Sequence, residues 1–314
     1  MKLKKIDKKS ILVVISLLAI SLFTSCDKDD DNGESSDPKC LISTLNNIWE
    51  EVCDEETDSD SAIFSLSYDS NDRLSKWEYD DGEYLLFLYN SDGKLVKIEE
   101  HWDNQVGYLH FSWEGNKVTR QWYWDDEPTS SKSIIEFNSN DEIVRVDGYH
   151  KDDEKWVLKW YDIYTWQDRN LVKIENYYSN GWKKSAEVGR KGKYRKGMFF
   201  RERLRENENV TELKLKNSSN DFELRYTTTF THDNKYNPFS LHKAIELLDL
   251  GYLFHSKNNV VEVENYKGEE YRWSETLQYE YNAQNYPSKL IIQEDEDEDC
   301  YGSETIEFNY KNCD

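Results

Sequence analysis

One phrase recurs along this 314-residue chain: an aromatic residue, a short polar turn, and then aliphatic residues that alternate with charged ones. In YNSDGKLVKIEE, which begins at Tyr89, Asp92 and Gly93 favour a tight turn, and Val96 and Ile98 alternate with lysine and glutamate. Alternation with a period of two places every second side chain on the same face of a strand. We therefore expect antiparallel strands with one apolar face and one wet face. Related phrases begin at Tyr68, Phe111, Phe137, Tyr164, Phe254 and Tyr279.

Short turns between successive strands predict a meander, because strands that follow one another in sequence usually pair. The chain contains 22 Tyr and 11 Trp but only 4 Pro, a composition that favours strands and excludes a disordered body. We expect an all-β fold over residues 57–314, an antiparallel hairpin-repeat meander forming a curled or barrel-like sheet that is soluble and apolar inside. Charged residues on the other face, such as Lys97, Glu99, Lys173 and Glu175, exclude contact with lipid tails.

Two segments depart from this pattern and predict short helices. In LISTLNNIWEEV, the spacing of Leu41, Leu45 and Ile48 is helical, so we expect an N-terminal helix over residues 39–56. In NPFSLHKAIELLDLG, Asn237 can cap a helix and Pro238 can occupy its first turn. This predicts a second short helix near residues 238–250, covering one end or edge of the sheet.

The start of the chain has the features of a secretory signal. A basic head containing five lysines is followed by an apolar run from Ile11 to Phe23, which is too short to span a bilayer. Small residues then precede Cys26, and the segment LFTSC resembles the signal of bacterial lipoproteins, in which this cysteine is acylated and becomes the new N-terminus. We therefore expect residues 1–25 to be a signal peptide and Cys26 to carry the lipid.

An acidic run that includes Asp29, Asp30 and Asp31 follows Cys26, so we expect residues 26–38 to be a disordered tether. The run also resembles the signal that sends some Gram-negative lipoproteins to the outer face of the outer membrane. This resemblance implies a lipid-anchored protein facing the cell exterior, held to the membrane through its anchor only. No apolar segment long enough to span a bilayer follows Cys26 in the sequence.

The net charge of the full chain is −23, and it becomes −27 without residues 1–25, which contain five lysines and Asp7. A body this acidic repels the phosphates of nucleic acids, so we exclude a nucleic-acid partner.

Two stretches carry a further resemblance, one from Asp233 to Glu264 and one from Tyr279 to Leu290. The repeats resemble the YD-type hairpin repeats of secreted bacterial proteins. The two stretches resemble a family of lipoproteins from Gram-negative bacteria of the Bacteroidetes type, a domain of unknown function with a porin-like fold. The resemblance covers about residues 60–314 and implies a fold without an assigned activity.

Four cysteines remain for disulfides in an oxidising compartment: Cys40, Cys53, Cys300 and Cys313. An intervening helix or strand would separate the two members of each sequence-adjacent pair by more than a disulfide can bridge. We therefore expect an N-terminal cysteine to join a C-terminal one, with free thiols as the alternative.

The sequence contains no motif that identifies a catalytic residue, a metal site or a cofactor. Its six histidines include no His-x-x-x-His pair, and neither a Cys-x-x-Cys motif nor a phosphate-binding loop occurs. Aromatic residues on the repeat strands are the best candidates for a binding surface, because flat rings stack on sugar rings. The ordinary alternative is packing in the core. The candidates are Trp102, Trp113, Trp122 and Trp124.

Trp122 and Trp124 must share one face of their strand, which leaves Tyr123 on the other. We expect a surface lipoprotein with a binding or accessory role, toward a glycan or an outer-membrane partner. A carboxylate-dependent hydrolase and an adhesin-like structural spacer are the alternatives.

Overall fold

A computed structural model describes residues 40–53, 56–102, 105–179, 222–248, 252–294 and 300–312. The chain divides into two units, residues 1–39 and residues 40–314, and all of the described residues belong to the second. The expected signal peptide, the acidic tether and Cys26 lie outside the described residues.

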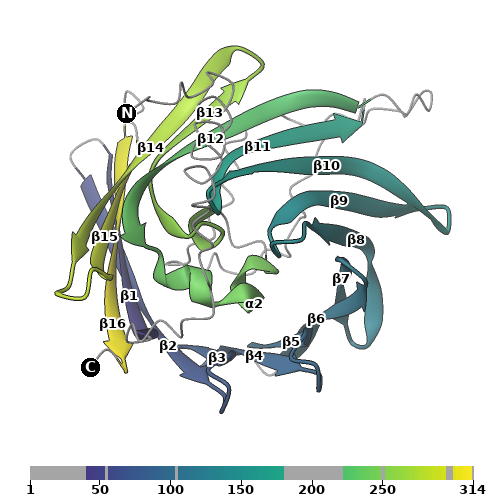
Figure 1. The fold of residues 1–314 in the computed structure, drawn as a ribbon, viewed down its shortest axis with the longest axis horizontal. Coiled ribbons are helices and arrows are strands. Elements are labelled where there is room, and N and C mark those ends of the chain that lie inside the picture. Colours follow the sequence, from purple (N-terminus) through teal and green to yellow (C-terminus); the bar gives the residue numbers. More distant parts are fainter. Residues whose placement is uncertain are drawn as a thin grey trace, which may run out of the picture. The chain divides into compact units, whose positions relative to one another are not determined.

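The described chain forms a closed antiparallel barrel (Figure 1). Each of its 16 strands pairs with the next one in sequence, and the last strand pairs with the first. The predicted all-β meander is therefore confirmed, and the sheet is closed rather than open. The strands are β1 (Leu41–Cys53), β2 (Glu56–Tyr68), β3 (Leu74–Tyr79), β4 (Tyr84–Tyr89), β5 (Leu95–Trp102), β6 (Gln105–Glu114), β7 (Lys117–Trp124), β8 (Glu127–Phe137), β9 (Ile143–Asp152), β10 (Lys155–Gln167), β11 (Asn170–Ser179), β12 (Phe222–Tyr236), β13 (Asn258–Lys267), β14 (Glu270–Tyr281), β15 (Pro287–Glu294) and β16 (Cys300–Lys311).

The expected helix over residues 39–56 is wrong, because residues 41–53 form strand β1. This strand pairs with β2 on one side and with β16 on the other, so its backbone is hydrogen-bonded along both edges. Leu45 is fully buried and shares a face with Asn47, which is also buried. Helical spacing is a weak preference that tertiary pairing overrides, and here the strand is needed to close the barrel.

The sequence repeat corresponds to one repeated turn. In four hairpins, an Asp or Asn side chain accepts hydrogen bonds from the backbone amides two and four residues later, at 2.9–3.1 Å. The residue three positions after each of these has a positive φ, which Gly, Asn and Asp tolerate best. The four side chains that accept these bonds belong to Asp69, Asn90, Asn138 and Asn282.

The aromatic residue of the phrase fastens neighbouring hairpins together. The Tyr89 hydroxyl donates to the Leu74 carbonyl at 2.8 Å, and the Trp113 indole donates to the Leu95 carbonyl at 2.7 Å. In each case the aromatic side chain lies near the end of one strand, and the carbonyl belongs to the first residue of the preceding strand. This explains why the aromatic residue recurs next to the turn. The same bond is made by Tyr68, Trp166 and Tyr310.

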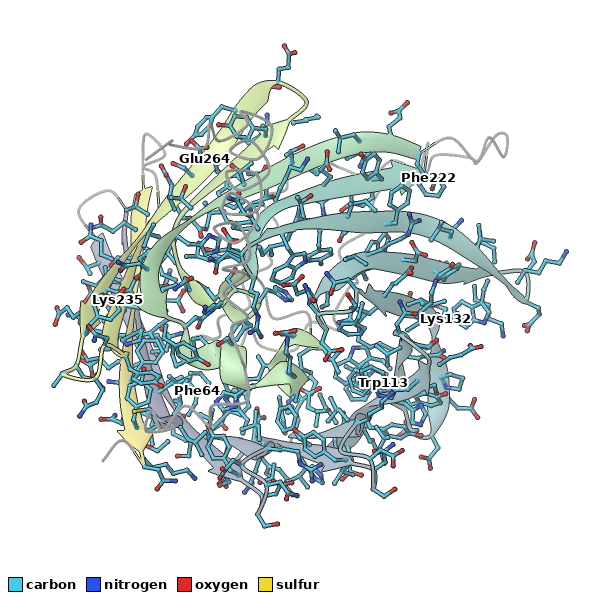
Figure 2. The ribbon with its side chains drawn as sticks, in the orientation of Figure 1. Phe64, Trp113, Lys132, Phe222, Lys235 and Glu264 are labelled. Carbon is cyan, nitrogen blue, oxygen red and sulfur yellow. The ribbon has the colours of Figure 1, made fainter. Side chains whose placement is uncertain are left out.

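Alternation along the strands separates an apolar inner wall from a charged outer wall. The inner wall holds one continuous hydrophobic cluster, against which Trp113, Trp122 and Trp160 pack. Phe64 and Trp113, labelled in Figure 2, mark two places on this wall.

The outer wall carries rows of ion pairs and aromatic rings. Lys97 pairs with Glu99 at 2.8 Å, and the same i,i+2 arrangement joins Lys173 to Glu175 at 3.0 Å. The bond to Lys97 holds the pKa of the Glu99 carboxyl below its usual value. The predicted charged face therefore lies on the outside of the barrel.

The connection between β12 and β13 folds back inside the ring of strands (Figure 1). It contains the short helices η1 (Pro238–Leu241), α2 (Lys243–Glu246) and η2 (Tyr252–Phe254), which confirms a helical segment near residues 238–250. We call the described residues of this connection, 237–248 and 252–257, the inner segment. None of the helices in the described ranges is long and apolar enough to cross a bilayer.

Asn237 caps η1 as predicted, since its side chain accepts a hydrogen bond from the Phe239 amide at 3.0 Å. The inner segment is fastened to distant parts of the wall. The Tyr68 hydroxyl on β2 lies 3.2 Å from the His242 imidazole, and the Arg120 guanidinium on β7 donates to the Leu247 carbonyl at 3.0 Å. The predicted helix therefore lies within the barrel rather than over an edge of the sheet, and it joins strands that are far apart in the wall.

Glu246 of the inner segment is 4% exposed, and burial raises the pKa of its carboxyl to about 7. Lys243 lies 3.3 Å away and opposes this shift, whereas Asp141 and Glu142 in the β8–β9 turn reinforce it. A carboxyl whose pKa is raised on folding lowers the stability as it ionises, over about pH 4.5–7.

We predict that Glu246→Gln raises the free energy of unfolding at pH 8 by about 1–3 kcal/mol and changes it little at pH 5. Urea denaturation followed by circular dichroism at the two pH values measures this difference. The control is Glu269→Gln in an exposed turn, which should have no effect at either pH. Equal effects of Glu246→Gln at both pH values would contradict the prediction.

Candidate functional site

Three of the four candidate tryptophans come together on neighbouring strands. The rings of Trp122 and Trp124 on β7 are nearly parallel, with centroids 6.0 Å apart and an interplanar angle of 6°. The Trp102 ring on β5 meets Trp124 edge to face, with centroids 6.3 Å apart. Pairing of β5 with β6 and of β6 with β7 brings these residues together.

These rings belong to the inner wall. Trp122 lies opposite Leu109, which is 1% exposed, and it packs against the core. Trp124 lies two residues further along β7 and therefore on the same face. Tyr123 points outward and stacks on Tyr108, with centroids 4.9 Å apart. The sequence prediction that Trp122 and Trp124 share a face is confirmed.

Gly107 on β6 lets the Trp124 ring lie against the wall. The two residues are opposite each other in the β6–β7 pair, and a Cβ atom on Gly107 would lie 2.4 Å from Cζ3 of the indole. Real Cβ atoms do not approach this closely, so only glycine leaves room for the ring. Trp124 is still 38% exposed, and the ring therefore has one supported face and other surface open to solvent.

Trp113 is separate from this group. It lies near the opposite end of β6 from Gly107, six residues or about 20 Å along the strand. Its indole N–H donates to the Leu95 carbonyl, and its ring stacks on Phe137 with centroids 5.8 Å apart. These contacts make it part of the fastening between hairpins, so it does not join the three-tryptophan group.

A second glycine supports a second tryptophan on the inner wall. Gly148 on β9 lies opposite Trp160 on β10, and a Cβ atom on this glycine would lie 1.9 Å from Cε2 of the indole. Trp160 packs against the core and remains partly exposed. Trp160 is not among the four tryptophans that the sequence suggested as candidates. The available signal was the presence of single glycines within two repeat strands, which often marks a close approach.

Carboxylates lie on the same wall as the tryptophans. Glu100 on β5 is directly opposite Gly107, and Asp162 lies two residues beyond Trp160 on β10. The Asn176 side chain donates to the Asp162 carboxylate at 2.7 Å. The wall around the two glycine–tryptophan pairs therefore carries carboxylates, which are negatively charged and accept hydrogen bonds.

One arrangement resembles a nucleophile beside a base, but it is structural. His232 Nε2 lies 2.8 Å from the Ser256 hydroxyl, and burial lowers the pKa of this histidine. Ser256, however, is 0% exposed, and its hydroxyl also accepts a hydrogen bond from the Leu171 amide at 3.0 Å. Substrate cannot reach this oxygen in the folded chain, so the pair serves to hold the inner segment.

Within the described ranges, no three His, Cys, Asp or Glu side chains form a group that could hold a metal ion. His101 lies on the outer wall, where its ring stacks on Tyr84 with centroids 4.3 Å apart. His150 lies 3.2 Å from the Ser131 hydroxyl. The contacts described for these two histidines are thus those of side chains packed on a strand surface.

The cysteines flank the seam between the first and last strands. Cys40 is disulfide-bonded, and it precedes Leu41, which lies opposite Lys311 on β16. At the other end of the seam Cys53 lies opposite Cys300 in the backbone register. Cys313 is outside the described residues. The pairing of an N-terminal cysteine with a C-terminal one stays a prediction.

We predict that Gly107→Ala lowers the free energy of unfolding by about 1–3 kcal/mol, because the new methyl group displaces the Trp124 indole from the wall. The same change should be nearly neutral when Trp124 is already alanine. Urea denaturation of the two single variants and the double variant measures this coupling. Additive effects would show that the ring does not depend on Gly107.

Comparison with known proteins does not establish a family for this chain. No family model matches it, and no curated protein matches it. Among solved structures, a porin-like protein from Bacteroides uniformis has a TM-score of 0.39 at 9% identity, covering 86% of this chain and 96% of that one. A porin-like protein from Bacteroides vulgatus has a TM-score of 0.36 at 9% identity, covering 87% and 99%. At this similarity the two structures carry no conclusion about function, and the architecture described above comes from the chain's own strand pairing.

Proposed function

We propose that this chain is a lipid-anchored surface protein that binds a glycan on the aromatic inner wall of its barrel. The observation that carries the proposal is the group formed by Trp102, Trp122 and Trp124, with one ring laid against Gly107. A packing residue needs no open surface, yet Trp124 keeps more than a third of its surface exposed, whereas Val118 on the same face of β7 is fully buried.

The chemistry of this wall suits carbohydrate. A sugar ring has one face of C–H groups and a rim of hydroxyls, so it combines an apolar contact with hydrogen bonds. A flat indole provides the apolar contact. Acceptors such as the Glu100 carboxylate, across β6 from Trp124, can receive hydrogen bonds from the hydroxyls. A few polar groups beside aromatic surface are typical of small-ligand sites.

The outer wall supports a barrel that stands in water and is held to the membrane by its anchor. Lys97, Arg145 and Lys173 lie on this wall in ion pairs. A lysine or arginine facing lipid near the bilayer midplane costs about 2–4 kcal/mol. Lys132, labelled in Figure 2, adds another charge, over the ring of Trp156. Stable attachment then requires the acyl chains at Cys26.

The two other functions considered for the sequence have less support. A carboxylate-dependent hydrolase needs two carboxyl groups within about 5–9.5 Å, whereas Glu100 and Asp162 lie on β5 and β10, five strands of about 4.8 Å apart. A structural spacer does not require Trp124 to remain exposed beside two other tryptophans.

We predict that the mature chain binds a subset of glycans on an array, and that Trp124→Ala weakens this binding at least tenfold, or by about 1.4 kcal/mol. Isothermal titration with the glycans retained on the array measures the loss. The matched control is Tyr123→Ala, the adjacent residue on the outer wall, which should leave the affinity unchanged. Both variants are checked for folding by circular dichroism.

Two results would overturn the glycan proposal. One is an array on which no glycan is retained. The other is equal binding by the Trp124→Ala and Tyr123→Ala variants. Release of reducing sugar from a bound glycan, abolished by a single carboxylate substitution, would favour the hydrolase instead. Loss of adhesion on deletion of the gene, with no glycan bound, would favour the spacer.

We predict that Cys26→Ser releases the protein from the membrane fraction of a Gram-negative host, because acylation requires the thiol and the described outer wall carries charged pairs such as Lys97–Glu99. Fractionation and labelling with a radioactive or clickable fatty acid measure attachment and acylation. Persistence of the serine variant in washed membranes would contradict anchoring through Cys26.

A further inference from the structure

The inner wall repeats one local arrangement at two places. In each, a glycine lies directly opposite a tryptophan on the following strand, and the indole occupies the space that the glycine Cβ would fill. The first pair is Gly107 with Trp124 across β6 and β7, and the second is Gly148 with Trp160 across β9 and β10. No other glycine whose surroundings the structure describes has a tryptophan this close to its Cβ position.

Glycine within a strand weakens it, so the presence of Gly107 and Gly148 in β6 and β9 needs a physical reason. A covering aromatic ring recovers part of the loss, and this explains each pair as a local packing solution. It does not explain why both pairs lie on the inner wall with their tryptophans partly exposed. A ring held flat against the wall has a fixed orientation, and this lowers the entropy cost of stacking a ligand on it.

The spacing of the two pairs indicates the size of the ligand. Trp124 lies on β7 and Trp160 on β10, three strands apart. Adjacent strands are about 4.8 Å apart, and the register places Arg120, four residues before Trp124, level with Trp160. The two tryptophans are therefore about 14 Å apart across the strands and about 13 Å apart along them. A single sugar ring covers one indole, and a chain of several sugars is needed to reach from one to the other.

The charge of the wall indicates which chains are accepted. Glu100 and Asp162 flank the two pairs. Of the nearby cations, Lys159 pairs with Asp152 at 2.5 Å, whereas Arg120 donates to the Leu247 carbonyl and keeps its charge. The chain as a whole has a net charge of −23, so uronic acids and sulfated sugars would approach a negatively charged protein.

We propose that the Gly107–Trp124 and Gly148–Trp160 pairs together hold one uncharged oligosaccharide chain. This inference rests on the proposed glycan function and adds to it the length and charge of the ligand. Trp160 is then a binding residue on β10, far in sequence from the β5–β7 group. The two glycines are positioning residues that set the angle of each ring.

The test uses the mature chain and ladders of one to six sugars: β-1,4-linked glucose, xylose and mannose, α-1,4-linked glucose, and the anionic oligogalacturonates. Isothermal titration should show at least a tenfold rise in affinity from the shortest binding member to the longest in an uncharged ladder. Trp160→Ala should remove this rise and leave the affinity for the shortest member unchanged. Oligogalacturonates should bind at least tenfold more weakly than uncharged chains of equal length.

Two further variants separate binding from folding. Trp156→Ala removes a tryptophan of the same strand from the outer wall, where Lys132 lies 4.6 Å from its ring centroid, and should change no affinity. Gly148→Ala keeps the Trp160 indole but tilts it, and should lower the affinity for long chains only. Melting temperatures of all variants identify any that fail to fold, and Trp160→Phe then replaces Trp160→Ala as a flat but smaller ring.

An affinity that does not depend on chain length, or that is unchanged in Trp160→Ala and Trp160→Phe, would overturn the two-pair proposal. Equal or tighter binding of oligogalacturonates would overturn its charge assignment. In these cases the glycan function would still stand, provided that Trp124→Ala weakens binding. Absence of binding to every ladder and to the array would overturn the glycan function itself.

Discussion

The pairing of β1 with β16 is the constraint on which the rest of the structure depends. It extends over the whole length of β1 and joins the first strand of the barrel to the last. Without it, two strands would expose unpaired backbone groups and the sheet would have two edges open to association. Closure also defines an inside and an outside, so every residue of the repeat acquires its environment from this one contact. The disulfide at Cys40 lies at one end of the seam, where it limits the freedom of the unfolded chain and opposes fraying of the first strand.

Much of this fold follows from local chemistry that is visible in the sequence. The recurring aromatic residue, Asx turn and alternating strand predict the hairpins, and the structure adds a reason for each part. Asn90 fills the turn with its side-chain bonds, Tyr89 fastens the hairpin to Leu74, and Ile98 faces the core while Lys97 and Glu99 pair outside. The number of strands could not be predicted in the same way. It depends on where the first and last strands meet, and this is a long-range contact that local patterns do not encode.

Where the structure departs from the sequence expectations, the reason is again a contact between residues far apart in the chain. Leu41, Leu45 and Ile48 have helical spacing, and only the presence of β2 and β16 on both sides makes a strand the better solution. The inner segment is helical as predicted, but its position within the ring depends on contacts with β2 and β7, which lie far away in sequence. At the candidate site, alternation was sufficient to place Trp122 and Trp124 on one face. It was insufficient to exclude Trp113 or to connect Trp160 with Gly148, because both facts depend on register between strands.

The position of the inner segment has a consequence for the aromatic wall. Because Arg120 on β7 is bonded to Leu247, the part of β7 next to the inner segment is occupied by protein contacts. Trp122 and Trp124 follow Arg120 along the same face of β7 and extend away from that contact. Burial decreases in the same direction, from Val118 at 0% exposed to Trp124 at 38%. One strand therefore changes from packed core to accessible aromatic surface over six residues. A chain that needed only a stable barrel would gain from continuing the core, so the exposed tryptophans are the part of this wall that packing does not explain.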